Sequence, residues 1–341
     1  MLRPLPPSKA APGEEDVDRV VCASLASDTH AMYVQMERIR ASSLRRNRAG
    51  QVHAALIYQS GWFLHWFEGP GPAVRELFER VRADPRHQAH RVLHHSRGRR
   101  FLPTAWSMMM SGSPEPAPLF GKRVEDLQKQ YEAGTQYAPT SVLRRLATPV
   151  RIVGQRAPAD PEAFHRICAV ASGNEAFDLV RWLARQHHAG VTTKRVAGES
   201  GHDSGSDYVE WMLGEHPCRV IAVARTALLH GLARVFLPDW PHLLLLFSGD
   251  ERRDDALMDR VRLACHHVPQ RPELVGVAPD VASQQRMAHA ARADGLSYHN
   301  AGLMSPQDSA AVWHVMEDLL QRFGPPPSSA WAVEDSDAWR N

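Results

Sequence analysis

The chain has 341 residues, of which 43% are hydrophobic and 23% charged, and its formal net charge at pH 7 is +2. These proportions are typical of soluble globular proteins, and this length favours about two domains. The small net charge gives no reason to expect nucleic acid or a membrane as an obligatory partner. The longest apolar stretch, around Leu243–Phe247, is too short to span a bilayer, and the Pro-rich start has no apolar core like that of a signal peptide. We therefore expect a cytoplasmic protein.

The cysteines and histidines do not predict a metal site. No two cysteines form a C-x-x-C pair, which argues against both a zinc site and a secreted disulfide framework. Adjacent histidines such as His94 and His95 point in different directions in a strand, so they do not present two imidazoles to one ion. The four cysteines are Cys22, Cys168, Cys218 and Cys265.

Residues 1–18 are rich in proline, and we expect a disordered lead. Over 19–111, hydrophobic periodicity alternates between strand and helix patterns. Asp28 and Thr29 are residue types that cap helices, and Asp84-Pro85 ends the second helix because proline cannot continue it. The predicted elements are strands at Val20–Ser24, Val52–Tyr58, Trp62–Phe67, Arg91–His95 and Trp106–Met110, with helices through Met32–Ile39 and Val74–Val81. The order βαββαββ predicts a ferredoxin-like α+β domain.

Residues 112–148 are interpreted as a connector with a short helix at Val124–Tyr131. Over 149–325, strands alternate with helices, which predicts an α/β domain with a mostly parallel sheet. Residues 326–341 form a polar tail. The predicted strands are Val150–Gly154, Arg219–Ala224, His242–Phe247, Leu274–Ala278 and Leu296–His299. The predicted helices are Pro161–His187, Ala227–Phe236, Asp255–His267, Ser283–Arg292 and Gln307–Phe323.

Several short motifs of the first domain occur in the order of one known family. They are Ser43 to Asn47, Ala55 to Tyr58 with Gly61 to Leu64, Glu68 to Pro70, Asp84 to His87, and Trp106 to Met108. On these motifs, the region from Arg19 to Met110 resembles a BLUF domain, the flavin-binding module that senses blue light. The resemblance implies FAD as cofactor, a role in signalling, and a dimer formed through this domain.

A flavin ring needs hydrogen-bonding groups along its edge and apolar walls on its faces. Ser43, Asn47 and Arg86 can supply edge contacts, and Ile39 lies one helical turn before Ser43. Together with the positions that the resemblance implies, the candidate cofactor-binding residues are Ile39, Ser43, Asn47, His65, Asp84, Arg86 and His87.

The chain departs from the family at the photochemical positions. The family's tyrosine in the first strand is replaced by Cys22, and its hairpin glutamine by His65. Trp106 and Met108 are retained. A thiol is a weaker donor than a phenol, and an imidazole cannot undergo the rearrangement of an amide. We expect the usual photocycle to be absent. Arg46 replaces an asparagine and either costs binding energy if it is buried without a partner or pairs with the phosphates of FAD.

The second domain shows no catalytic motif. Gly154–Asp160 lacks the second Gly, the Lys and the Ser/Thr of a phosphate-binding loop. Gly201–Gly205 holds Ser, His and Asp as close neighbours, which triad geometry forbids, so we interpret it as a loop. Acidic residues at 250–255 suit the start of a helix. We therefore predict a non-enzymatic sensory protein with an unidentified downstream protein partner. The alternative is an interaction scaffold that binds no flavin.

Overall fold

The computed structural model describes residues 16–147, 164–200, 203–266, 268 and 271–323. The chain forms two compact units. Unit 1 contains the described residues up to Ala147 together with Lys194–Asp203, and unit 2 contains the other described residues. Most of the predicted lead, the predicted strand Val150–Gly154 and the predicted tail lie outside the described residues.

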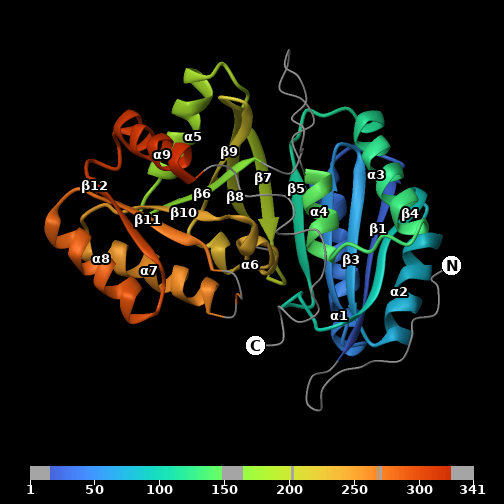
Figure 1. The fold of residues 1–341 in the computed structure, drawn as a ribbon. Helices are drawn as coiled ribbons and strands as arrows, with labels where there is room; N and C mark the ends of the chain where they lie inside the picture. The colour runs from blue at the N-terminus through green and yellow to red at the C-terminus, as the bar shows by residue number, and fades with distance from the viewer. Residues whose placement is uncertain (1–15, 148–163, 201–202, 267, 269–270, 324–341) are drawn as a thin grey trace. The chain divides into compact units, whose positions relative to one another are not determined.

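Unit 1 has the predicted ferredoxin-like βαββαββ order at its start (Figure 1). Its elements are β1 (Val17–Ala26), α1 (Met32–Ala49), β2 (His53–Gln59), β3 (Trp62–Gly69), α2 (Gly71–Ala83), β4 (His87–Gly98), β5 (Ser107–Ser111), α3 (Ala117–Glu132), α4 (Pro139–Ala147) and β7 (Thr192–Ala197). The strand order is β7-β5-β2-β3-β1-β4. The tight turn between β2 and β3 uses Ser60 and Gly61, both with positive φ, as a two-residue hairpin of this twist requires.

Helices α1 and α2 cover one face of this sheet. Met32, Met36 and Ile39 recur one turn apart on α1 and are buried with Leu77 and Phe78 of α2 against the strands. Asp28 does not cap α1, which begins after Ala31 without a side-chain cap. The oxygens of Asp28 instead accept hydrogen bonds from His30, which corrects the predicted capping role.

The segment interpreted as a connector contains two helices, α3 and α4. Phe120, Val124 and Leu127 recur at helical spacing and are buried. The indole of Trp62 on β3 donates to the Ala117 carbonyl at 3.1 Å, and its ring lies 6.5 Å from that of Phe120. Residues 117–147 therefore cover apolar side chains on the second face of the sheet. The helical structure there is longer than the predicted helix Val124–Tyr131, because more of it packs against the sheet.

Strand β7 was not predicted. It pairs antiparallel with β5, with Ala197 opposite Met108 and Arg195 opposite Met110. Residues 194–203 belong to unit 1, although the sequence on both sides belongs to unit 2. The added strand pairs a β5 edge that would otherwise expose unpaired backbone groups.

Unit 2 is a mostly parallel sheet with helices on both faces, as predicted. Its elements are β6 (His165–Ala171), α5 (Glu175–Gln186), β8 (Asp203–Leu213), β9 (His216–Val223), η1 (Ala227–Leu229), α6 (Gly231–Phe236), η2 (Leu237–Asp239), β10 (His242–Leu246), α7 (Glu251–Cys265), β11 (Glu273–Ala278), α8 (Val281–Ala293), β12 (Tyr298–Leu303) and α9 (Ser309–Phe323). The strand order is β12-β11-β10-β6-β9-β8; the strands from β12 to β9 are parallel to one another, and β8 is antiparallel to β9.

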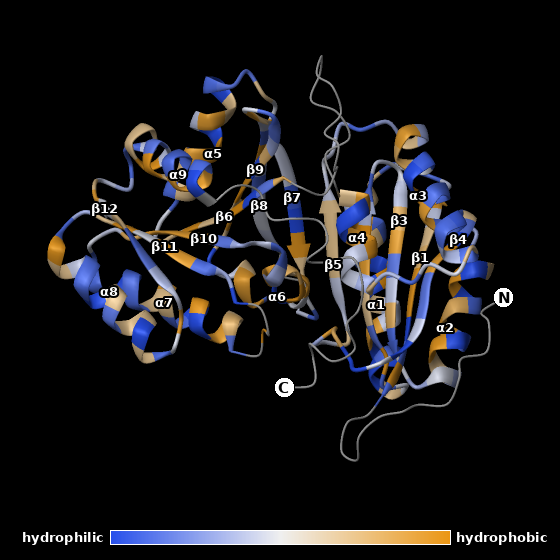
Figure 2. Ribbon diagram, viewed as in Figure 1, coloured by the Kyte–Doolittle hydropathy of each residue, from blue (hydrophilic) through white to orange (hydrophobic). Residues whose placement is uncertain are grey.

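Burial on both faces explains the run of leucines in β10. Leu244 and Leu246 pack in one core with α5 and α9, while Leu243 and Leu245 pack in the other core with α7 and α8. A strand covered on both sides is apolar throughout rather than alternating. Figure 2 shows hydrophobic residues along the strands and alternating colours around the helices of each unit.

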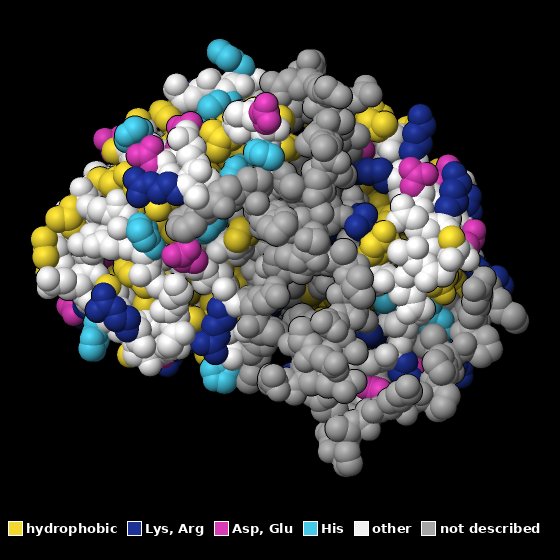
Figure 3. Space-filling view, viewed as in Figure 1, with side chains coloured by type: hydrophobic (Ala, Val, Ile, Leu, Met, Phe, Trp, Pro, Cys, Tyr) yellow, Lys and Arg dark blue, Asp and Glu magenta, His cyan; other side chains and the backbone are white. Residues whose placement is uncertain are grey.

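Two predictions for unit 2 were wrong. The expected helix Pro161–His187 contains β6 before α5, because the apolar run at 165–171 is a buried strand ended by Ser172 and Gly173. Of the region interpreted as a loop at 201–205, residues 203–205 belong to β8, which begins at Asp203, and residues 201 and 202 lie outside the described part of the chain. On the face of unit 2 visible in Figure 3, acidic, basic and histidine side chains are interspersed. Within the described residues, no helix is long and apolar enough to cross a bilayer.

Candidate functional site

A cavity of about 100 Å³ lies between helices α1 and α2 and the sheet of unit 1. Strands β2 and β3, the turn after α2 with the first residue of β4, and Trp106 just before β5 complete its wall. The seven candidate cofactor-binding residues all line it: Ile39, Ser43, Asn47, His65, Asp84, Arg86 and His87. Trp106 lines it as well, whereas Cys22 and Met108 are outside its wall. The fold thus brings together residues that are up to 67 positions apart in the sequence (Ile39 to Trp106).

Two polar atoms in the cavity wall lack hydrogen-bond partners among the described residues. These are Nε2 of His65 and Nε1 of Trp106, and both residues are only 4% exposed. A buried nitrogen without a partner costs about 1–3 kcal/mol. Since both atoms belong to residues that line the same cavity, a ligand with acceptor atoms would satisfy them. The arrangement fits the polar edge of a flavin ring.

Burial keeps the histidines of the cavity neutral near pH 7. Desolvation lowers the pKa of His87 to about 4 and that of His65 well below its ordinary value. The two rings have centroids 4.8 Å apart, and the nearby His87 further lowers the pKa of His65. Nδ1 of His87 is hydrogen-bonded to the Ser24 hydroxyl at 2.9 Å, and this bond fixes the ring against the sheet.

The cavity mouth is basic. Arg46 and Arg80 are exposed lining residues, and Arg86 is half-buried. Arg86 donates from Nε to Asp84 at 2.9 Å, and hydrogen bonding from Arg86 lowers the pKa of Asp84 to about 2. Because Arg46 is exposed, the cost of burying an unpaired guanidinium does not arise. A cation-rich mouth over a neutral interior suits a ligand with a polar ring and a phosphorylated tail.

Cys22 lies beside the cavity wall without forming part of it. It is opposite His65 in the register of β1 and β3, on the same face of the sheet. Its side chain is 1% exposed, and burial raises the pKa of the thiol to about 12. The thiol is therefore protonated and shielded, as expected of an unreactive core cysteine.

Glu68 is a structurally important residue. Its burial was not predicted from the sequence, because the motif Glu68-Gly69 suggested only a turn. Its carboxylate is fully buried and accepts hydrogen bonds from the backbone of Phe101 and Leu102, both at 2.7 Å, and from the Trp66 indole at 3.0 Å. Burial raises the pKa of Glu68 to about 7. These bonds hold the chain that leads into β5 and Trp106. An acidic residue inside an otherwise apolar strand was the available signal.

The comparisons with known proteins agree with the motifs in unit 1. Residues 18–109 match the family described as sensors of blue light using FAD. Residues 18–109 are a BLUF domain. The family is described as one of sensors that detect blue light with FAD.

Relatives and solved structures with BLUF domains are similar over part of the chain. The photoactivated adenylate cyclase subunit beta of Euglena gracilis is 27% identical over 143 residues, which is 41% of this chain and 16% of that protein. The Euglena longa protein of the same name is 26% identical over 143 residues. This chain therefore spans about a sixth of the length of these relatives. The dark-state structure of the BLUF protein BlrB covers 36% of this chain and 88% of its own, at 22% identity and a TM-score of 0.27.

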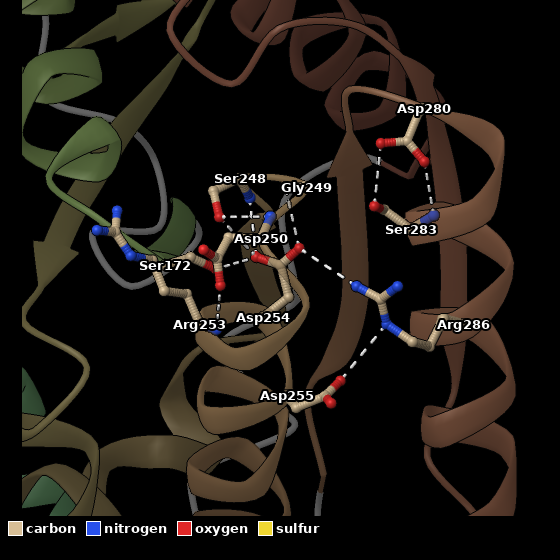
Figure 4. Close-up of polar contacts among 10 residues, drawn as sticks. All are labelled: Ser172, Ser248, Gly249, Asp250, Arg253, Asp254, Asp255, Asp280, Ser283 and Arg286. Atoms are coloured by element: carbon tan, nitrogen blue, oxygen red, sulfur yellow. Dashed lines mark hydrogen bonds and ion pairs between the residues drawn. The ribbon is translucent and has the colours of Figure 1, made fainter.

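Unit 2 has a polar cluster at the carboxyl ends of β6 and β10, drawn in Figure 4. Asp254 is fully buried and accepts hydrogen bonds from the Ser172 hydroxyl at 2.5 Å and from the backbone of Ser248 and Gly249 at 2.8 and 3.0 Å. Arg286 lies 3.8 Å from it. These partners occupy both carboxylate oxygens, so the cluster fixes the loop that follows β10.

Helices α7 and α8 each begin with an aspartate cap. Asp250 caps α7 by accepting the Arg253 backbone N–H at 3.0 Å. Asp280 does the same for α8 through Ser283. Within the part of the chain that the structure describes, no group of three or more His, Cys, Asp or Glu residues is arranged to hold a metal ion.

Proposed function

We propose that the cavity of unit 1 binds FAD and that the protein is a flavin-dependent sensor. The observation that carries this proposal is a pair of buried nitrogens, His65 Nε2 and Trp106 Nε1, which have no hydrogen-bond partner among the described residues and belong to residues that line one cavity. The same cavity is lined by Ser43, Asn47 and Arg86, which lie in motifs of the family. When bound, FAD would supply the absorption of blue light.

The residues of the chain would divide the binding between ring and tail. His65, Trp106 and Asn47 would meet the polar edge of the ring, while Ile39, Leu77 and Phe67 would provide apolar surface. Arg46 and Arg80 would pair with the phosphates at the mouth. Neutral His65 and His87 keep the interior free of added positive charge at pH 7.

We further propose that the photocycle usual for the family is absent. Cys22 is a buried thiol with a pKa of about 12 and lies outside the cavity wall. It offers neither the phenol nor a direct contact with the bound ring. His65 can donate or accept a hydrogen bond, but it has no amide to rotate or tautomerise. The domain would then report flavin occupancy or flavin redox state rather than light in the usual way.

The deciding experiment is the visible absorption spectrum of the purified full chain, before and after blue light and after addition of FAD. A flavin band that survives gel filtration supports the proposal, and an unchanged light-minus-dark spectrum supports the loss of the photocycle. A colourless protein that also rejects added FAD refutes flavin binding and favours the non-sensory scaffold. Comparing FAD with riboflavin tests the arginines, because only FAD carries phosphates.

For unit 2 we propose an output role without catalysis, through an unidentified protein partner. Its clearest polar cluster, around Asp254, is occupied by internal hydrogen bonds (Figure 4). A nucleotide-dependent rise in the melting temperature of the full chain would contradict this part of the proposal. The homodimer and the cytoplasmic location that the sequence suggested are also proposals, and sedimentation of the purified chain tests the former.

A further inference from the structure

We propose that Glu199 is a positioning residue that links the cavity of unit 1 to the segment 194–199, so that a ligand in the cavity changes the stability of this segment. The ligand part of the proposal rests on the flavin binding proposed above. The sequence on both sides of this segment belongs to unit 2, whereas the segment itself belongs to unit 1.

A continuous set of hydrogen bonds runs from the cavity to Glu199. Asn47 lines the cavity and is 2% exposed, and its Nδ2 donates to the Ala105 carbonyl at 3.1 Å. The backbone N–H of Ala105 donates to Oε1 of Glu199 at 2.7 Å. The other carboxylate oxygen of Glu199 binds Arg48, the residue after Asn47. One carboxylate therefore holds the end of α1 and the residue before Trp106 together.

Further contacts fasten the same segment along α1. Nη1 of Arg40 donates to the Glu199 carbonyl at 3.0 Å, and the Arg195 guanidinium lies 3.9 Å from the centre of the Tyr33 ring. Ala197 is fully buried in the core shared by α1, α2 and the sheet. The segment thus contacts α1, which carries cavity residues, and β5, which follows Trp106 directly.

The charge of Glu199 is maintained by its partners. Burial alone would raise its pKa, but hydrogen bonds from Arg48 and the Ala105 amide outweigh burial and hold the pKa below its ordinary value. A charged acceptor makes these bonds stronger than neutral ones. A ligand that draws Asn47 into the cavity would therefore act on Ala105, then on Glu199.

The test is amide hydrogen exchange of the full chain, read on peptides that cover 194–199, in a double-mutant cycle. Asn47→Ala removes the first bond of the series and should speed exchange there about five-fold, the factor for one neutral hydrogen bond. Ser42→Ala is the matched control, since Ser42 lines the same cavity but its hydroxyl donates to the Ile39 carbonyl, within its own helix, rather than to the chain at Ala105. It should leave exchange at 194–199 unchanged.

In Glu199→Ala, the Asn47→Ala change should have no further effect on the segment, because the link is already broken. An equal effect of Asn47→Ala in both backgrounds overturns the proposal. Glu199→Gln keeps an acceptor for the Ala105 N–H and should retain most of the coupling. This variant also provides a test if Glu199→Ala does not fold.

Adding FAD provides the second arm. FAD should alter exchange at 194–199 in the wild type but not in Glu199→Ala, with the flavin band present in both. A change of equal size in both proteins overturns the linkage. If no flavin band is present, the proposed FAD binding is refuted. The double-mutant cycle of Asn47→Ala and Glu199→Ala, measured in the flavin-free protein, still tests the role of Glu199.

Discussion

Acidification should weaken unit 1 through His87. The pKa of His87 is about 4 in the folded protein, because burial disfavours the charged ring, against an ordinary value of 6.5. The unfolded chain therefore binds this proton more readily between pH 6.5 and pH 4. Neutral His87 therefore makes its full contribution to the free energy of unfolding above pH 6.5. This contribution is lost as the pH falls from 6.5 to 4.

The size of the effect follows from the two values. For pKa values of 4 and 6.5, the free energy of unfolding should be about 2 kcal/mol lower at pH 5 than at pH 7 from His87 alone. Glu68 acts in the opposite direction, since burial raises its folded pKa to about 7 and its protonation favours the folded state as the pH falls. The contribution of His87 must therefore be taken as the difference between wild type and His87→Gln at each pH.

The assay is urea denaturation of the full chain at pH 7 and pH 5, read on the amides of β1 and β3, which report on unit 1. His87→Gln should remove the loss of about 2 kcal/mol. His30→Gln is the control, because His30 is exposed on the same unit. If wild type and His87→Gln differ by the same amount at both pH values, His87 titrates alike in the folded and unfolded states and the reasoning fails. An NMR titration of the His87 ring gives the same answer directly.

The remaining predictions concern buried carboxylates and the substituted photochemical positions. Glu68→Gln should lower the stability of unit 1 by about 1–3 kcal/mol, because an amide NH₂ would then face an N–H donor. The control is Glu76→Gln, at an exposed position. Equal stabilities of the Glu68→Gln variant and the wild type would contradict the role of Glu68. Asp254→Asn should cost unit 2 a similar amount, read on the amides of β10, whereas half-exposed Asp255→Asn should not. Cys22→Tyr with His65→Gln should restore a reversible light-induced change in the flavin spectrum, and Cys22→Phe with His65→Gln should not. A bound flavin that stays unresponsive in the first pair would show that the loss lies beyond these two positions.

The periodicity of the sequence was sufficient for most elements of unit 1. Met32, Met36 and Ile39 at helical spacing predict α1, and the Ser60-Gly61 turn predicts the hairpin, because both signals are local. The candidate binding residues could be chosen only through the family's motifs, since Ser43 or Arg86 alone is an ordinary helix-end residue. Nothing in the local sequence indicates that His65 and Trp106 would be left with buried, unpartnered nitrogens on one cavity.

The misassigned parts of the chain share a physical cause. The apolar run of β6 has the length of a strand, but an apolar run buried on both faces has no period that separates it from a helix. Strand β7, with Thr192, Lys194 and Arg195, is too polar to be recognised by hydrophobicity. It becomes a strand because β5 offers it an unpaired edge.

The sequence by itself determined the order of elements, the BLUF motif and the two altered photochemical positions, because each is written in residue types at short spacing. Only the tertiary structure decided that Glu68 is buried beneath the chain leading to Trp106, that Arg46 is exposed at the cavity mouth, and that Glu199 binds Arg48. These depend on pairing between residues up to 151 positions apart. Such pairing is set by packing and register, to which local sequence contributes little.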